Sequence, residues 1–168
     1  MLAELFHIAL ILATLLCTLV TGLVFGFAVV VMPGLAKLSD RELLLAFKHI
    51  DGIIQDQQAA FMIVWVGSIA AIITMMVLGT LNISGTQLYL MWFASVLYLL
   101  GVQLPTIRFN IPLNNGVQAL DIDNLSESDL AQARTQFEAP WNRWNRIRTM
   151  NGMIAVAALL VLLSGRWT

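Results

Sequence analysis

The residues best suited to chemistry form one short stretch, directly before the last apolar run: Trp141-Asn-Arg-Trp-Asn-Arg-Ile-Arg-Thr149. Side chains three, four and seven positions apart share one face of a helix. That face carries two indoles, an amide and a guanidinium, which belong to Trp141, Trp144, Asn145 and Arg148. Guanidinium and amide groups can donate hydrogen bonds to a developing oxyanion, and indoles can wall an apolar slot. We therefore predict that Arg148 and Asn145 hold an oxyanion beside Trp141 and Trp144.

The depth of Arg148 in a membrane follows from its spacing to Arg166, near the C-terminus. At about 1.5 Å per residue, the two lie roughly 27 Å apart along a helix, slightly less than a hydrocarbon core of about 30 Å. Arg148 is thus expected at the membrane boundary or just inside it, where an ionisable side chain is a functional candidate. The alternative is an arginine that reaches outward to lipid phosphate, and the spacing leaves both open.

A general base could come from an amphipathic segment at about 39–58, which Ser39 and Glu42 open with capping-box spacing. We expect this segment to lie on the membrane surface or to fold over the end of a bundle. It carries His49 and Asp51, and Asp51 is the predicted catalytic base. For either residue, the alternative is a position on a solvated helix face.

Neutral polar side chains supply further candidates for substrate binding. Asn110 and Asn114 flank Pro112, which disfavours helix, so we expect an extended or turn segment at the membrane edge. Their amides could bind substrate, or they could satisfy freed backbone groups at a helix end. Tyr98 and Gln103 could line a cavity or form hydrogen bonds within the core.

Composition indicates an integral membrane protein. The 168 residues are 59% hydrophobic and only 11% charged, with a mean hydropathy of +0.82, whereas soluble domains carry about 25% charge. The net charge of −1 predicts no nucleic-acid partner. A single cysteine excludes an intramolecular disulfide and a cysteine-built zinc site. The sequence offers no evident metal motif, and no cofactor is evident from it.

We predict an all-α fold, an up-down-up-down four-helix bundle with amphipathic and extended cytoplasmic connections. The chain forms one transmembrane domain, 1–168. Its transmembrane helices are expected at about 5–33, 59–81, 87–107 and 140–165. The segments 39–58 and 109–139 are expected to form a cap over the cytoplasmic end of the bundle. Pro140 is expected in the first turn of the last helix, and Pro33-Gly34 is expected to stop the first. A separate short helix should run from Ser126 to about Glu138.

The first helix carries a face of small residues every four positions, at Thr14, Thr18, Gly22 and Gly26. Such a face lets another helix approach closely in lipid, so a homo-oligomer formed through it is one expectation. The alternative is that these residues occur here only because glycine and threonine are common in membrane helices.

The distribution of Lys and Arg predicts the orientation of the chain. Eight lie in or beside the two long connections, and only Arg166 lies on the opposite side. We therefore expect both connections to be cytoplasmic and both termini outside, with a bacterial inner membrane as the location. The lipid bilayer is the first partner that this implies.

Three motifs together resemble the anthrone-oxygenase-like family of small four-helix membrane proteins. They are Met32-Pro33-Gly34-Leu35, Asn110-Ile-Pro112-Leu-Asn114-Asn115 and Trp141-x-x-Trp144-Asn145-x-x-Arg148-Thr149. The resemblance covers essentially the whole chain and implies oxidation of polyketide anthrones to anthraquinones with O2. The family often has asparagine where Asp51 stands here. Carried over by motif, the matching positions are Asn110, Pro112, Asn114, Trp141, Trp144, Asn145 and Arg148.

Three functions stay open on these observations. The chain could be an oxygenase acting with O2 on a flat aromatic ketone, phenol or quinol, with the substrate oxyanion held by Arg and Asn side chains. It could bind a quinone, lipid or small aromatic ligand without catalysis. It could also be a structural subunit of a membrane complex.

Overall fold

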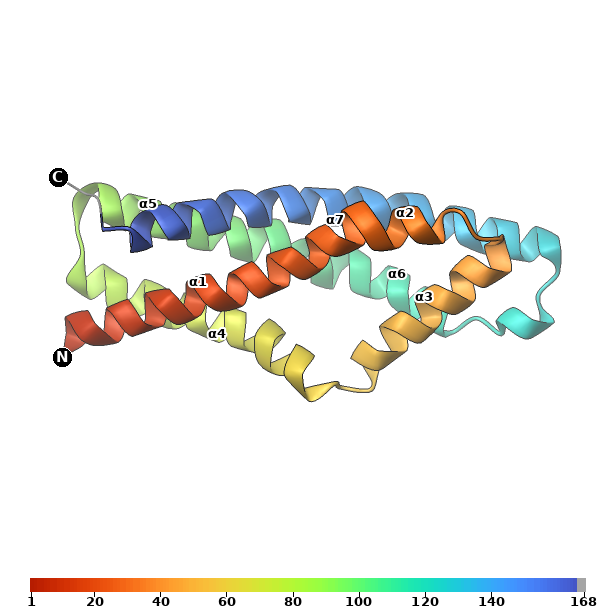
Figure 1. Cartoon of the computed structure of the whole chain (residues 1–168), viewed down its shortest axis with the longest axis horizontal. Helices are drawn as coiled ribbons and strands as arrows, with labels where there is room; N and C mark the ends of the chain where they lie inside the picture. Colours follow the sequence, from red (N-terminus) through yellow and green to blue (C-terminus); the bar gives the residue numbers. More distant parts are fainter. Residues whose placement is uncertain (166–168) are drawn as a thin grey trace.

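Four long apolar helical rods run side by side in the computed structural model, which describes residues 1–165 (Figure 1). They cover Leu2–Leu35, Ala59–Asn82, Gly85–Gln118 and Glu127–Leu163. Each is long and apolar enough to cross a membrane, and residues 1–165 contain no β-strand. The prediction of an all-α integral membrane bundle is therefore confirmed. Arg166, the cation expected on the opposite side, lies outside the described residues.

Short π-helical stretches, labelled η1 to η3, interrupt two of the rods. The elements in chain order are α1 (Leu2–Gly26), η1 (Phe27–Val31), α2 (Met32–Leu35), α3 (Asp40–Gln55), α4 (Ala59–Asn82), α5 (Gly85–Tyr98), η2 (Leu99–Gln103), η3 (Thr106–Asn110), α6 (Ile111–Gln118), the 3-10 turn η4 (Ile122–Asn124) and α7 (Glu127–Leu163). Stretches of π-helix are often found at functional sites. The first rod ends slightly later than predicted, since Pro33 and Gly34 lie inside its last turn.

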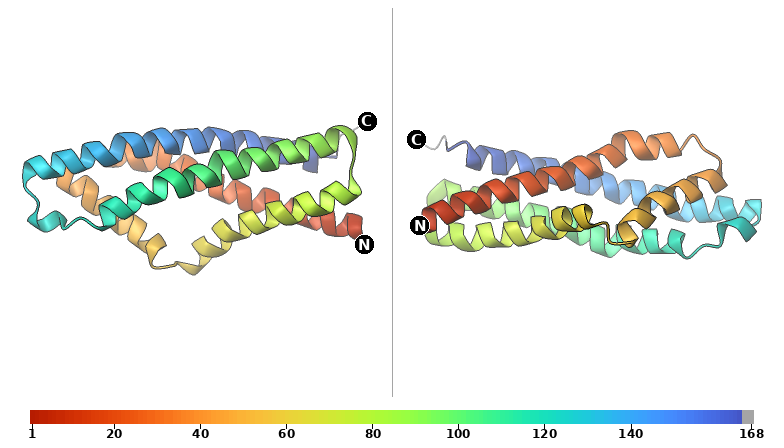
Figure 2. Two further views of the ribbon diagram at one scale, coloured as in Figure 1. Left: turned by 180° about the vertical axis from the view of Figure 1, so that it is seen from behind. Right: turned by 60° about the horizontal axis from the view of Figure 1, so that its bottom comes forward.

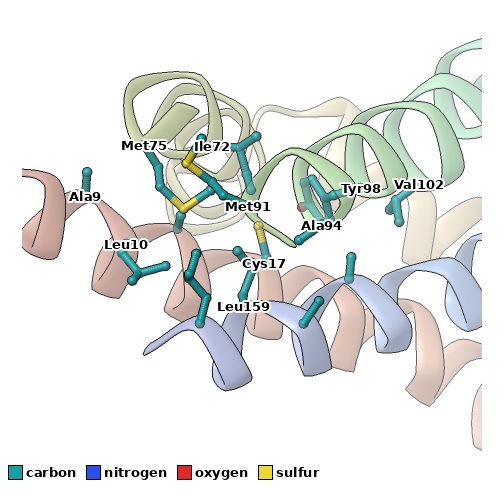
Figure 3. Close-up of a cluster of buried hydrophobic side chains, with 14 of the residues drawn as sticks. Ala9, Leu10, Cys17, Ile72, Met75, Met91, Ala94, Tyr98, Val102 and Leu159 are labelled. Carbon is teal, nitrogen blue, oxygen red and sulfur yellow. The ribbon is translucent and has the colours of Figure 1, made fainter. Parts of the chain in front are cut away.

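The rods alternate in direction, with the start of α1, the α4–α5 turn and the end of α7 at one end of the molecule (Figures 1 and 2). α1 packs against α4 and α7, and α5 packs against α7. The buried core between them includes Leu10, Cys17, Met75 and Met91 (Figure 3). On the first rod, Thr18 and Gly22 remain exposed, so packing of a second copy on the small-residue face stays a prediction.

The α4 rod is shorter than its neighbours, and this difference creates the feature on which the site depends. Its 24 residues extend about 36 Å, near the thickness of a membrane, whereas the rods of 34 and 37 residues extend about 50 Å or more. The three longer rods extend beyond the end of α4. Helix α3 folds back beside these extensions and meets α4 in an elbow (Figure 1). Ser39 and Glu42 form the predicted capping box at its start.

The connection predicted as extended from 109 onward is helical as far as Gln118, which corrects the sequence prediction. Proline removes one backbone donor and crowds the carbonyl four residues earlier. For Pro105 that carbonyl belongs to Gly101, and the Asn151 side chain on α7 donates to it at 3.4 Å. Pro112 falls in the first turn of α6, directly after the π-helical stretch η3, where a missing donor is tolerated.

The prediction that Pro140 opens the last helix is also wrong. α7 begins at Glu127 under a Ser126 cap, as predicted for the shorter helix, but continues without a break to Leu163. Pro140 lies in its interior and, lacking a backbone N–H, removes one hydrogen bond from this 37-residue helix. Phe47 of α3 packs against Phe137 and Trp141, one on each side of this position, and supports the helix there.

Candidate functional site

A cavity of about 250 Å³ lies beside the α3–α4 elbow. Its walls come from α1, η1, α3, α4, η3, α6 and α7, so segments far apart in the sequence meet there. Most of the lining is apolar and aromatic, including Phe27, Phe47 and Trp65. The polar lining consists of Asp51, Gln55, Thr106, Asn110, Asn114 and Arg148, beside the indole of Trp141. An apolar pocket with a few convergent polar groups is the usual form of a small-molecule site.

Arg148 is drawn inward and is only 6% exposed. Its Nε donates to Asn145 Oδ1 at 2.9 Å, and its Nη1 donates to Thr106 Oγ1 at 3.1 Å. Its guanidinium carbon lies 5.3 Å from the centre of the Trp141 ring. Among residues 1–165 no carboxylate forms an ion pair with it. A buried cation without a counter-ion is costly, so this guanidinium is suited to bind an anion.

Asp51, on α3, lines the same cavity and is buried, so the solvated-face alternative is wrong for it. Its Oδ1 accepts from Asn114 Nδ2 at 2.7 Å, and its Oδ2 accepts from Gln118 Nε2 at 2.9 Å and Gln55 Nε2 at 3.2 Å. All three donors are neutral amides. His49, by contrast, is exposed and lines a groove on another side of α3.

Trp141 connects the cationic and acidic sides of the cavity. Its Nε1 donates to Asn114 Oδ1 at 2.7 Å, and Asn114 in turn donates to Asp51. On the cationic side, the Trp141 ring contacts the Arg148 guanidinium. Phe27 and Phe47 hold the ring in place, with centroid distances of 5.7 and 5.5 Å. A continuous series of contacts therefore joins Arg148 to Asp51 without an ion pair between them.

The sequence led us to expect the asparagines to hold the oxyanion directly, and in the structure each of them uses one of its two amide N–H groups on a group of the protein. Asn145 Nδ2 donates to the Val24 carbonyl at 3.1 Å, and Asn114 Nδ2 is bonded to Asp51. Asn110 Nδ2 donates to the Trp141 carbonyl at 3.3 Å. The asparagines thus position Arg148, Asp51 and Trp141, and the guanidinium is the charged donor that the cavity lining offers to an anion.

Asn110 leaves one group unused. Its Oδ1 is buried and has no partner within residues 1–165. The orientation of the amide is determined by the Trp141 carbonyl, which can only accept and therefore requires the nitrogen on its side. Because buried acceptors are normally satisfied, this oxygen is suited to accept a hydrogen bond from a bound molecule.

Four sequence candidates do not line the cavity: Asn145, which bonds Arg148 from behind, and Trp144, Tyr98 and Gln103. Trp144 stacks on Phe109, with centroids 3.6 Å apart and an interplanar angle of 4°. Tyr98 donates to Ser68 Oγ at 2.8 Å and accepts from Gln103 Nε2 at 3.0 Å. Tyr98 points into the buried core (Figure 3), so core hydrogen bonding describes it and Gln103.

Sequence reasoning missed Thr106, Gln55 and Gln118, which bond to Arg148 or Asp51. A signal existed. Polar residues recur every four positions at Thr106, Asn110, Asn114 and Gln118, which is the spacing of one helix face. Assigning an extended segment around Pro112 concealed this face. Within residues 1–165, no group of three or more His, Cys, Asp or Glu residues is placed to hold a metal ion.

Comparison with known proteins bears on the last three rods of the bundle. The family model described as anthrone oxygenase matches residues 55–163, well over half of the chain. The match includes Asn110, Asn114, Trp141 and Arg148, whereas Asp51 precedes it. No match to this chain is found among curated proteins or among solved structures.

Proposed function

The chain belongs to the anthrone oxygenase family, and we propose that it is a membrane-embedded oxygenase acting with O2 on a flat aromatic ketone, phenol or quinol in the cavity at the elbow. The observation that carries this proposal is the buried Arg148 guanidinium, which has no ion-pair partner within residues 1–165 and shares the cavity with Asp51. A cation and a carboxylate in one cavity suit a ligand that becomes an anion by losing a proton.

For a ketone with an acidic CH2 group, the reaction balances without an added reductant. Asp51 takes a proton from the carbon, and the electron pair moves onto the carbonyl oxygen, where Arg148 stabilises the oxyanion. The enolate transfers one electron to O2, and the two radicals combine to form a carbon–oxygen bond and a peroxide anion, to which Asp51 returns the proton. Removal of the second carbon-bound proton breaks the oxygen–oxygen bond. One CH2 group and one O2 thus become one carbonyl and one water.

Asn110 Oδ1, which has no partner among the described residues, refines the proposed ligand. Since this oxygen only accepts, it would bind a hydroxyl on the same molecule whose oxyanion faces Arg148. A phenol or a hydroxylated aromatic ketone supplies both groups on one flat ring system. The aromatic walls at Phe27, Phe47 and Trp141 fit such a ring system.

We also propose that the elbow end of the bundle is cytoplasmic and that both termini are outside, in a bacterial inner membrane. The cations in or beside the connections at this end support the assignment: Lys37, Arg41, Lys48, Arg108, Arg134, Arg143, Arg146 and Arg148.

The test is O2 uptake by the purified full-length protein in lipid nanodiscs, with an anthrone as substrate and quinone absorbance as a second readout. We expect uptake by the wild type and a loss of about 10²- to 10⁴-fold in Asp51→Asn, which cannot take the proton. His49→Gln, on the outer side of α3, is the matched control and should retain the wild-type rate. Equal rates in wild type and Asp51→Asn would remove Asp51 from the mechanism.

A second candidate is non-catalytic binding of a quinone or another small aromatic molecule. The three amide hydrogen bonds on Asp51 favour it, because they occupy lone pairs that a base would use. Wild-type protein that retains an aromatic ligand through purification but consumes no O2 with any anthrone or quinol tested would support this candidate.

A further inference from the structure

The polar and apolar linings of the cavity differ in depth. Asp51, Asn110 and Arg148 are 2%, 1% and 6% exposed. The apolar residues at its edge are far more open, with Leu23 at 39%, Met62 at 38%, Ile50 at 37% and Ile111 at 41%. The cavity therefore has a polar floor, and its exposed edge, or mouth, is apolar except at Gln55.

The mouth continues into surfaces that face lipid. On α1, Leu23 follows exposed Leu19 one turn earlier, and on α4, Met62 precedes exposed Val66 by one turn. Ile111 follows exposed Ile107 in the same way on the third rod. Since α4 has nearly the thickness of a membrane and Met62 lies in its first turn, this mouth is level with the membrane boundary.

The other side of Asp51 is separated from the aqueous groove behind α3. Gln118 Nε2 bonds both the Asp51 carboxylate and the Lys48 carbonyl, each at 2.9 Å. Gln55 Nε2 bonds Asp51 at 3.2 Å and Asn115 Oδ1 at 3.1 Å. These cross-links tie α3 to α6 and form a polar seam between Asp51 and the groove, which is lined by His49, Asp56, Asp121 and Asp123.

We propose that the ligand of this cavity enters laterally from the bilayer, through the mouth formed by Leu23, Ile50, Met62 and Ile111, and that its class is an aromatic molecule dissolved in the membrane. This inference rests on the proposed function, because it concerns the same cavity. The aromatic rings pass between α1, α4 and the third rod with little desolvation of polar protein groups, and the ligand oxygens meet Arg148 and Asn110 only at the floor.

The test compares matched tryptophan insertions at the two entrances, in full-length protein in phosphatidylcholine nanodiscs. Leu23→Trp with Met62→Trp narrows the lipid mouth, and His49→Trp with Asp56→Trp narrows the groove. The probe is 1-hydroxyanthraquinone, followed by its own absorbance in stopped-flow mixing. We expect the mouth variant to slow association and dissociation alike, by about tenfold. Its Kd should change little, because an entrance residue affects the barrier more than the bound state, and a preserved Kd also shows that the variant is folded. Should the double variant fail to fold, Met62→Trp alone replaces it.

The outcomes are distinguishable. Slowing by the groove variant instead of the mouth variant, or by neither, overturns lateral entry and leaves the proposed function standing. Failure of the wild type to bind the probe refutes the proposed function and the lateral entry with it.

Discussion

Replacing Arg148 with methionine removes the guanidinium while keeping much of the side-chain volume, so it separates charge from packing. In the proposed mechanism the guanidinium stabilises the enolate oxygen far more than the neutral ketone. A preorganised charged donor of this kind contributes about 2.7–4 kcal/mol to the transition state, which corresponds to roughly 10²- to 10³-fold in rate. We expect Arg148→Met to lose that factor in O2 uptake.

The substitution should leave the bundle folded. It deprives the buried Asn145 Oδ1 of its donor, a loss of about 1–3 kcal/mol. Against this, it removes a buried cation that has no carboxylate partner in the described part of the chain. Thr106 loses only an acceptor contact, since its hydroxyl already donates to the Val102 carbonyl at 2.8 Å. The two effects oppose each other, so thermal unfolding in nanodiscs should change little.

Arg146→Met is the matched control, because Arg146 is exposed two positions away on the same helix. It should retain the wild-type rate, as surface substitutions usually change stability by no more than about 0.5 kcal/mol. An Arg148→Met protein that unfolds like the wild type and oxidises anthrones and quinols at the same rate would refute the role of the guanidinium. A rate loss matched by an equal loss in Arg146→Met would point to general disruption of the helix.

Two further substitutions have matched controls in the chain. Trp141→Phe keeps a ring but removes the donor to Asn114 Oδ1, so thermal unfolding should show a destabilisation of about 1–3 kcal/mol, whereas Trp144→Phe, which keeps a ring to stack on Phe109, should change stability less. Gly152→Ala places a Cβ 2.8 Å from Thr21 Oγ1 and should destabilise by about 1–3 kcal/mol in thermal unfolding. The Cβ that Gly22→Ala adds has no neighbouring heavy atom within 4 Å, so stability should stay equal or rise slightly.

The membrane bundle could be predicted from the sequence because its signal is local. Apolar runs of bilayer length specify spanning helices by themselves, and the Ser39 and Ser126 caps lie within four residues of the groups they bond. The depth of Arg148 was also within reach, since its spacing to Arg166 restricts it, but the same spacing left an inward and an outward side chain both open.

The helical connection around Pro112 could not be predicted in the same way. Proline and asparagine lower local helix propensity, but propensity is a weak prior that tertiary contacts override. Here Asn114 bonds Asp51 and Trp141, which lie 63 and 27 positions away in the chain. Contacts of this kind are invisible in a local pattern, and they convert poor helix formers into a polar helix face.

The distribution of charge within the cavity explains why amides are so numerous there. Arg148 and Asp51 are both buried, and direct pairing would have neutralised each of them. Instead, Asn114, Gln55 and Gln118 hold the carboxylate, while Asn145 and Thr106 hold the guanidinium. An ion pair across the cavity would have to be broken before a ligand oxyanion could bind, at a cost of several kcal/mol. Neutral amides fix both charged groups without satisfying either charge, so the cation and the carboxylate stay available to a molecule bound between them.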